Sequence, residues 1–259
     1  MDLIACDVPR VDPVTNLALE EALVRGLLHV PLLRIWQNEA CVVLGRGQQV
    51  DREANVVACA ASGVPVLRRA SGGGAVYHDR GNLNITMAVP GWVPGLARDL
   101  AALVAGVLRR LGLAPVVTGR GVFTGPVKVS GLASQLTRAA TLAHATLLVT
   151  TPASRIRAFL TSAPPDTRPL DSRRSPVAPL SELAPGMCVA AARDLVLAEA
   201  AQRYGPLAPR PVSAAEMRWQ RLLLAQRYTS QAWHRTGRTP LVRTEETEWT
   251  RRPDARCTR

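Results

Sequence analysis

Lysine is almost missing from this sequence. All but one of its 32 basic residues are arginine, and the exception is Lys128. Lysine is ordinarily among the commoner residues of proteins. A single lysine therefore marks a candidate position at which a guanidinium does not replace a compact ammonium.

Aromatic residues, long apolar runs and paired cysteines are also scarce. Aromatics make up only 4% of 259 residues, so the expected core consists mainly of Ala, Val and Leu. No run approaches the roughly 20 apolar residues of a membrane span, and the acidic N-terminus does not resemble a signal peptide. The five cysteines show no CxxC spacing, which argues against a metal site or a disulfide framework and favours a cytoplasmic location. Cys41 and Cys59 lie in apolar runs and are predicted to be small core residues.

The formal net charge of +12 is spread unevenly, with the larger surplus after residue 150. Such a surplus can attract nucleic acid, an anionic membrane or an acidic protein. Nucleic-acid binding usually also shows interleaved aromatics or a recognisable helical motif, and neither is present. We therefore expect no nucleic-acid partner, and no membrane partner.

The segment 68–86, RRASGGGAVYHDRGNLNIT, is the most informative stretch. Three consecutive glycines leave backbone N–H groups free to approach an anion. The flanking VPVLRR, AVYH and NLNITMAVP read as strands, so no helix follows the glycines. This context excludes both a Walker loop and a Rossmann turn, which need a helix start at that point.

The remaining pattern predicts a mixture of helices and strands. Glu20 and Glu21 are expected on a solvated helix face. Residues 161–186, rich in Pro, Ser and Arg, suggest a loop, and the chain after Arg235 reads as a charged, flexible tail. Helices are predicted at 13–30, 51–62, 96–112, 187–204 and 213–228, and strands at 32–37, 41–44 and in short runs between 116 and 150.

RRASGGGAVYHDRGNLN resembles the signature of lipoate–protein ligases, members of the biotin/lipoate ligase superfamily. Three other stretches are similar to family elements in the same order: VTNLALEEALVRG, GRGVFTGPVKVSGLASQ and LAHATLLV. The second contains Lys128 at the position of the family's essential lysine. Counting lysines and matching motifs are separate arguments, and they select the same residue.

The resemblance implies an α+β fold like a class II synthetase core, with a mixed, mainly antiparallel sheet and packed helices. The catalytic domain would cover residues 1–235, with a helical C-terminal part at 170–235 and the tail at 236–259. The implied reaction uses ATP and Mg²⁺ to convert lipoate or octanoate into an acyl-adenylate, and then transfers the acyl group to a lysine. The implied acceptors are lipoyl domains of 2-oxoacid dehydrogenases or glycine-cleavage proteins, with a separately encoded accessory subunit as a further expected partner.

The resemblance also assigns site residues. Lys128 would be catalytic, following negative charge from the carboxylate to the α-phosphate. Arg68 is either a solvated strand end or a ligand contact. Asp79 is either a turn residue or a site residue. His144 belongs to the expected ligand-binding set but is more simply explained as a structural residue. Asn84 is a further candidate for orienting a ligand. The expected ligand-binding set is Arg69, Ser71, Gly72, Gly73, Gly74, Ala75, Val76, Tyr77, His78, Asp79, Asn82, Lys128, Ser130, Gly131, Ala133 and His144; no metal ligand is assigned.

Other functions remain open at this point. An octanoyltransferase of the same fold would need a cysteine nucleophile before the lysine element, and residues 116–128 contain none. A non-catalytic homologue could bind acyl-carrier or lipoylated proteins through the basic C-terminal half. A biotin ligase relative agrees less well with the Arg-Arg-x-Ser-Gly-Gly-Gly form.

Overall fold

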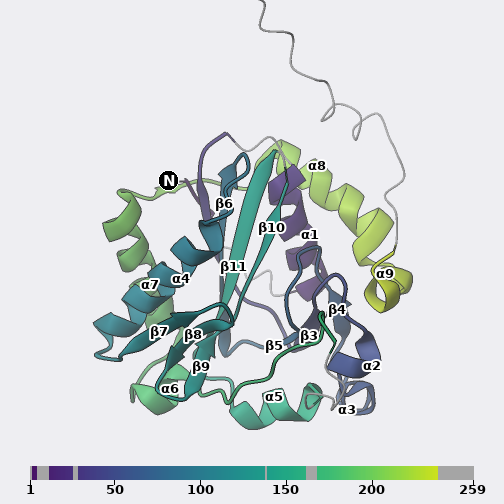
Figure 1. Ribbon diagram of the computed structural model, residues 1–259. Helices are drawn as coiled ribbons and strands as arrows, with labels where there is room; N and C mark the ends of the chain where they lie inside the picture. The colour runs from purple at the N-terminus through teal and green to yellow at the C-terminus, as the bar shows by residue number, and fades with distance from the viewer. Residues whose placement is uncertain (1, 5–11, 26–28, 138, 162–167, 239–259) are drawn as a thin grey trace, which may run out of the picture.

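The computed structural model (Figure 1) describes residues 2–4, 12–25, 29–137, 139–161 and 168–238. Its largest sheet has six strands in the order β10, β11, β6, β2, β1 and β12. The first four pair antiparallel, whereas β1 lies parallel to both β2 and β12. The bounds in that order are Leu132–Leu136, Ala140–Leu148, Asn82–Pro90, Leu32–Trp36, Asp2–Ile4 and Ala208–Pro209.

Two smaller sheets of three strands flank the large one. In the first, β3 (Cys41–Leu44) lies between β4 (Val66–Arg68) and β5 (Val76–His78). In the second, β8 (Gly121–Thr124) lies between β7 (Pro115–Thr118) and β9 (Val127–Ser130). The glycine run therefore joins β4 to β5, and Lys128 lies on the other small sheet.

Helices cover both faces of the large sheet (Figure 1). Alternate residues of a strand point to opposite faces, so Leu33 and Ile35 pack with α4 (Leu96–Arg110) and α7 (Val189–Tyr204) in one core. Leu32 and Trp36 pack on the other face with α1 (Pro13–Arg25) and α8 (Ala214–Leu223). A π-helical turn, Leu224–Tyr228, and α9 (Gln231–Thr236) follow α8.

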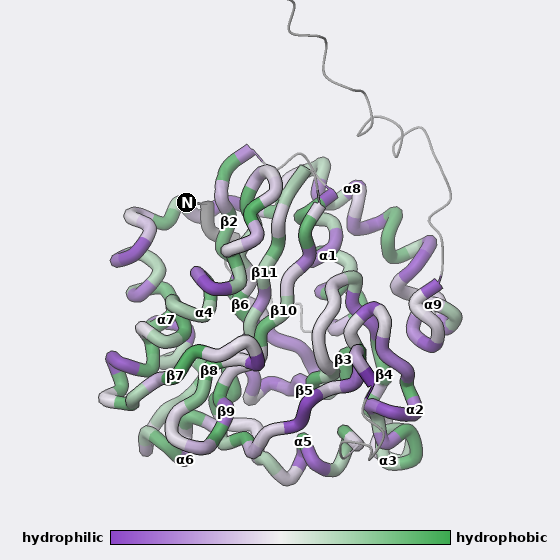
Figure 2. Tube along the Cα trace, viewed as in Figure 1, coloured by the Kyte–Doolittle hydropathy of each residue, from purple (hydrophilic) through white to green (hydrophobic). Residues whose placement is uncertain are grey.

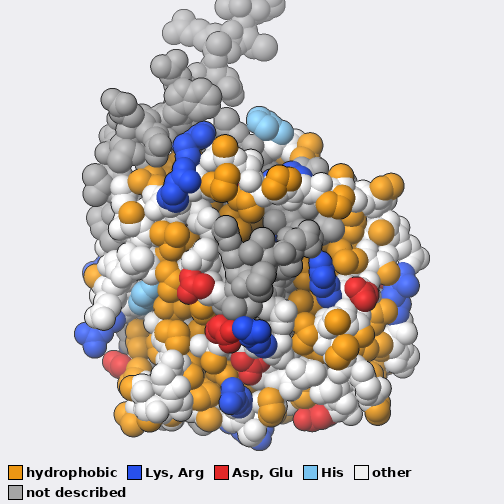
Figure 3. Space-filling view, turned by 180° about the vertical axis from the view of Figure 1, so that it is seen from behind, with side chains coloured by type: hydrophobic (Ala, Val, Ile, Leu, Met, Phe, Trp, Pro, Cys, Tyr) orange, Lys and Arg blue, Asp and Glu red, His pale blue; other side chains and the backbone are white. Residues whose placement is uncertain are grey.

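A third core lies under the β4–β3–β5 sheet. It contains Cys59, Tyr77 and Phe159 and is closed by short helices. These are α2 (Val50–Glu53), α3 (Val56–Ala61) and α5 (Ala153–Phe159); α6 (Leu180–Leu183) lies further along the chain. The exterior mixes apolar side chains with side chains of both charges, as the view from behind shows (Figure 3).

The predicted α+β class with mainly antiparallel pairing is confirmed. Cys41 and Cys59 are buried, as expected. The single helix predicted over 51–62 is wrong: extended backbone at Ala54 separates two helices, and the side chain of Asn55 caps the second. The predicted helix over 13–30 ends at Arg25 within the described residues, and α9 lies beyond the last individually predicted helix, 213–228. The tail predicted from residue 236 lies, after Arg238, outside the described residues.

The prediction that Glu20 and Glu21 face solvent is also wrong. Both are buried, because α1 has the large sheet on one side and α8 with its π-helical turn on the other. Arg34 Nη1 donates to Glu20 Oε1 at 2.8 Å, and Tyr228 Oη donates to Glu21 Oε2 at 2.9 Å. Buried carboxylates persist where such partners satisfy them.

No helix in the described parts of the chain is both long and apolar enough to cross a membrane.

Candidate active site

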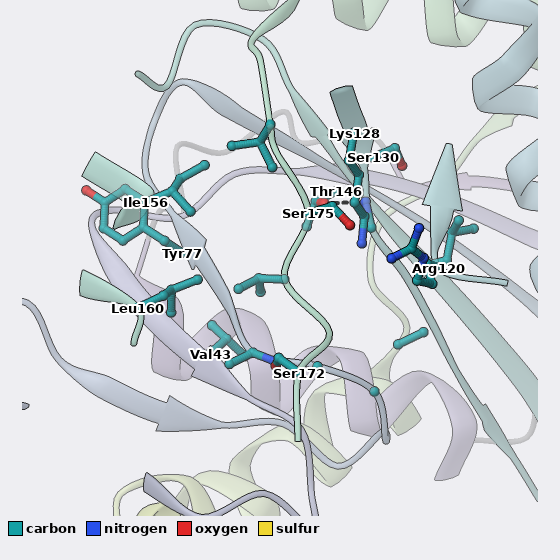
Figure 4. A pocket seen from close by; sticks show the side chains of 18 of the residues that line it. Val43, Tyr77, Arg120, Lys128, Ser130, Thr146, Ile156, Leu160, Ser172 and Ser175 are labelled. Atoms are coloured by element: carbon teal, nitrogen blue, oxygen red, sulfur yellow. Dashed lines mark hydrogen bonds between the residues drawn. The ribbon is translucent and has the colours of Figure 1, made fainter. Parts of the chain in front are cut away.

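A cavity of about 960 Å³ lies where the two small sheets meet the large one. Its lining includes Arg69, the β5 residues that follow the glycine run, and Lys128. Figure 4 shows Tyr77, Ile156 and Leu160 on one side and Lys128 and Arg120 on the other. Segments widely separated in sequence therefore build one site.

The glycine run adopts a conformation that side chains would prevent. Gly73 has φ +84°, in the left-handed region that favours glycine. A Cβ placed on Gly45 would lie 2.0 Å from the carbonyl oxygen of Gly73, and one on Gly74 would lie 2.8 Å from Ser172 Oγ. The loop is thus held by close backbone contact. Gly73 and Gly74 line the cavity, whereas Ser71 and Gly72 are not part of its lining.

Arg69 stabilises this loop from inside. Its Nη2 donates to the carbonyl oxygens of Gly72 and Gly74 at 2.6 and 2.8 Å, and its Nε donates to Ser71 Oγ at 3.0 Å. Burial lowers the pKa of Arg69 to about 10, in spite of the opposing effect of Glu53. Arg69 lines the cavity, but much of its donor capacity is used to fix the loop.

Arg68 performs neither of the two roles expected for it. Its side chain is fully buried and donates to backbone carbonyls of two distant segments. Nη1 reaches the oxygens of Gly45 and Gln48 at 2.8 and 2.7 Å, and Nη2 reaches that of Arg235 at 3.0 Å. Arg68 therefore joins β4 to the loop after β3 and to the end of α9.

Lys128 enters the cavity from β9 between two glycines. Its Cε would lie 2.6 Å from a Cβ on Gly121, and its Nζ would lie 3.6 Å from a Cβ on Gly131. Burial, followed by the neighbouring charges of Arg120 and Arg174, lowers the pKa of Lys128 to about 8. The site thus holds an ammonium that would gain stabilisation from an anionic ligand.

The three other predicted site residues of the lysine element, Ser130, Gly131 and Ala133, also line the cavity. Ser130 Oγ is buried, and no described residue is its hydrogen-bond partner. The backbone N–H of Gly131 donates to Thr146 Oγ1 at 3.0 Å, which joins β10 to β11 next to Lys128.

His144 is part of the site wall. It lines the cavity, its Nε2 lies 2.9 Å from Ser71 Oγ, and its Nδ1 lies 3.4 Å from Glu20 Oε2. The expectation of a mainly structural role agrees with these contacts, and the residue also faces the ligand space. Glu20 therefore contacts a residue of the site wall, although the sequence predicts a solvated helix face for it.

The polar residues after the glycine run divide into two groups. His78 and Asn84 line the cavity, together with Ala75, Val76 and Tyr77. Asp79 instead accepts from the backbone N–H of Gly81 at 2.8 Å, which is the contact that the turn alternative predicts, and it is not part of the lining. Asn82 donates to Asn84 Oδ1 at 3.0 Å and lies outside the lining.

A segment not assigned to the site from sequence, residues 169–177, crosses the cavity (Figure 4). It is a largely hydrophilic stretch running between β9 and β5 (Figure 2). The backbone N–H of Ala75 donates to Ser172 Oγ at 2.7 Å, Arg174 Nη1 donates to the carbonyl oxygen of Ala75 at 3.1 Å, and the N–H of Lys128 donates to Pro176 O at 2.8 Å. The adjacent arginines in DSRRSP could have indicated that this segment belongs to an anion-binding site. The Pro- and Ser-rich composition predicted only a loop.

The cavity carries a strong excess of positive charge. The cationic side chains in its described lining are Arg69, Arg120, Lys128, Arg157, Arg173 and Arg174, against one carboxylate, Asp171, which Arg52 already binds. No group of three or more potential metal ligands occurs among the described residues. The arrangement suits a ligand with several negative charges.

Comparison with known proteins agrees with the motif. The lipoyl protein ligase A/B catalytic domain family matches residues 12–201. The chain belongs to this family. A candidate lipoate-protein ligase A of Aeropyrum pernix is 43% identical over 150 residues, which are 56% of this chain and 57% of that protein. The chain thus spans little more than half the length of this relative.

Solved structures of family members share the fold. A chain from the lipoylation system of Thermoplasma acidophilum, described as a bi-partite lipoate protein ligase and its E2 lipoyl domain, has a TM-score of 0.80 at 25% identity over 94% of this chain and 98% of that chain. A lipoate-protein ligase A bound with ATP has a TM-score of 0.78 at 24% identity over 90% and 97%. The lipoate–protein ligase fold inferred from the motifs is therefore confirmed, whereas the domain limits and individual residue roles remain predictions.

Proposed function

We propose that this protein is an ATP-dependent ligase that activates lipoate, or octanoate, as an acyl-adenylate and transfers the acyl group to a lysine of an acceptor domain. The observation that carries the proposal is the position of Lys128. The only lysine of the sequence projects into an arginine-rich cavity that the glycine loop also lines. Family membership agrees with this reading.

The proposed chemistry has two steps. A carboxylate oxygen of the acid attacks the α-phosphorus of ATP, and pyrophosphate leaves. The neutral amine of the acceptor lysine then attacks the acyl carbonyl; AMP leaves and the amine loses a proton. Lys128 and Arg120 would stabilise the negative charge that develops near the α-phosphate, which is the kind of fixed electrostatic support that accounts for much of enzymatic rate enhancement.

Two parts of the cavity would receive different parts of the intermediate. Leu17, Trp36 and Val43 are each at most 2% exposed and form a buried apolar part of the lining, here called the closed end, which suits a flexible acyl chain. The other end, beside Ile156 and Arg157, is more open and suits the nucleotide. The carboxylate and the α-phosphate would meet between them, beside Lys128.

Mg²⁺ would arrive as part of the substrate MgATP. The one carboxylate in the described cavity lining, Asp171, accepts from Arg52 Nε at 3.0 Å, so these residues do not form a protein-held magnesium site. Magnesium in such enzymes is commonly held in large part by substrate phosphates.

The proposed acceptors are lipoyl domains of 2-oxoacid dehydrogenases or glycine-cleavage proteins. The Thermoplasma neighbour, which spans nearly the same length, is described as part of a bi-partite ligase with an E2 lipoyl domain. By analogy we propose that a separately encoded subunit assists this chain. The excess of arginine around the cavity would favour an acidic acceptor surface.

A thioester-forming transferase receives less support. Cys41 and Cys59 are buried and Cys188 is the N-cap of α7, and none of the three lines the cavity. Burial also raises the pKa of the Cys41 thiol far above its ordinary value, which opposes thiolate formation.

The deciding experiment is ATP–pyrophosphate exchange, run with lipoate, octanoate and no acid. Acid-dependent exchange by this chain, alone or with its accessory subunit, is the expected result. Acyl transfer to a lipoyl domain from octanoyl carrier protein without ATP, together with absent exchange, would overturn the proposal in favour of the transferase.

A further inference from the structure

Two buried polar donors remain unsatisfied at the closed end of the cavity. His78 is 4% exposed and Asn84 is 2% exposed, and both line the cavity. Neither His78 Nε2 nor Asn84 Nδ2 has a hydrogen-bond partner among the described residues. Buried polar groups are nearly always paired, so two such atoms on residues that line one cavity need an explanation.

The protonation of His78 follows from a chain of hydrogen bonds that starts at an arginine. Arg34 Nη2 can only donate, and it donates to Asn16 Oδ1 at 2.5 Å. The Nδ2 of Asn16 then donates to Asn38 Oδ1 at 2.9 Å, which turns the amide nitrogen of Asn38 toward His78 Nδ1 at 3.1 Å. Nδ1 is therefore an acceptor, and Nε2 carries the proton.

The imidazole also stays neutral. Burial, followed by the charges of Arg69 and His144, lowers the pKa of His78 to about 3. At neutral pH, His78 thus presents one fixed N–H donor to the cavity rather than a cation.

Asn84 presents a second donor beside it. Its Oδ1 accepts from Asn82 Nδ2 at 3.0 Å, which fixes the amide and leaves Nδ2 without a partner among the described residues. Asn84 lies opposite Trp36 in the β2–β6 ladder, and the rings of Trp36 and His78 are 6.1 Å apart. Both donors therefore flank the same tryptophan at the closed end.

Resting on the function proposed above, we infer that His78 and Asn84 recognise the divalent sulfur of the acyl tail, and so select a dithiolane-bearing acid over an all-carbon acid. Divalent sulfur is a weak acceptor of low polarity that also suits the apolar contact with Trp36 and Leu17. An all-carbon tail would fill the same space and leave both N–H groups unpaired. A site built to pair a polar ligand atom discriminates against an analogue that lacks it.

The test compares lipoate with 5-cyclopentylpentanoate, which has the same ring size and chain length and no sulfur. The acid preference is the ratio of kcat/KM for the two acids in pyrophosphate exchange, measured for the same protein, so that general losses of activity cancel. The wild type should prefer lipoate by about tenfold or more, and His78→Phe and Asn84→Leu should each reduce that ratio by about fivefold.

Asn82→Leu is the matched control. It breaks the same Asn82–Asn84 hydrogen bond as Asn84→Leu but keeps the Asn84 amide as a donor, so it should reduce the preference by less than Asn84→Leu does, whatever its effect on rate. Circular dichroism would establish that all variants are folded. Because two unrelated substitutions are used, loss of one variant leaves the other to decide.

Three results would overturn the inference. They are an equal rate of exchange with both acids in the wild type, an unchanged preference in both variants, or a rise in the KM for ATP without a change in preference. If no acid supports exchange, the proposed function fails. Calorimetric titration of the two acids into the ATP-free protein then tests the two donors separately. A preference for lipoate that the variants lose would still support the role of His78 and Asn84.

Discussion

The substitution Lys128→Arg keeps the positive charge but replaces a compact ammonium by a larger, planar guanidinium. The lysine stem passes so close to Gly121 that a Cβ there would lie 2.6 Å from Cε, and Nζ lies close to Gly131. A guanidinium cannot take the same path without displacing one of these backbones. We therefore expect its nitrogens to miss the α-phosphate position.

The size of the loss follows from the role assigned to Lys128. Removing one fixed group that stabilises transition-state charge typically costs about 10²–10³ in kcat, or about 3–4 kcal/mol. We expect Lys128→Arg to lose at least about 100-fold in acid-dependent pyrophosphate exchange while remaining folded by circular dichroism. Arg98→Lys, the reverse exchange at an exposed position of α4 outside the cavity lining, is the control and should keep wild-type activity. Activity of Lys128→Arg within about threefold of wild type would refute the argument.

Three other predictions follow from the charged groups. Because the pKa of Lys128 is about 8 and the ammonium is the active form, kcat/KM for ATP should fall as pH rises through about 8; a flat profile from pH 7 to 9 would contradict this. Arg68→Met should lower the free energy of unfolding in urea by about 3–5 kcal/mol, because it leaves several buried carbonyls unpaired, and a loss below about 1 kcal/mol would show that Arg68 is dispensable. Glu20→Gln should cost about 3–5 kcal/mol in the same assay because it leaves Arg34 buried without its anion, and unchanged stability would disprove that pairing.

The sequence was sufficient to predict those parts of the site that are contiguous in the chain. The glycine run, the strand after it and the element around Lys128 are local patterns, and the structure places them around one cavity. The strand context of the glycines also excluded the two nucleotide-binding loops that need a helix, and β5 does follow the loop.

The errors concern groups whose partners are distant in the chain. Glu21 belongs to an adjacent pair of acidic residues in a helix, a pattern that predicts a solvated face. Its burial depends on Arg227 and Tyr228, which lie about two hundred residues later in the chain. Arg68 similarly depends on carbonyls of α9. Periodicity reports which face of a helix is apolar, but it does not report that a second layer covers the polar face. Ser172 and Arg174 were missed because a Pro-rich segment has no periodic signal that places it across a cavity.

The segment 169–177 also limits the distance between two walls of the cavity. Ser172 is tied to Ala75 at the end of the glycine run, and Pro176 is tied to the backbone of Lys128. Four peptide steps at roughly 3.5 Å each allow at most roughly 14 Å between these two attachment points. The distance between the glycine loop and Lys128, where an acid and a phosphate would be brought together, is thus limited by the length of the chain between Ser172 and Pro176. One inserted residue between Ser172 and Pro176 would change that limit without altering any other side chain that lines the cavity.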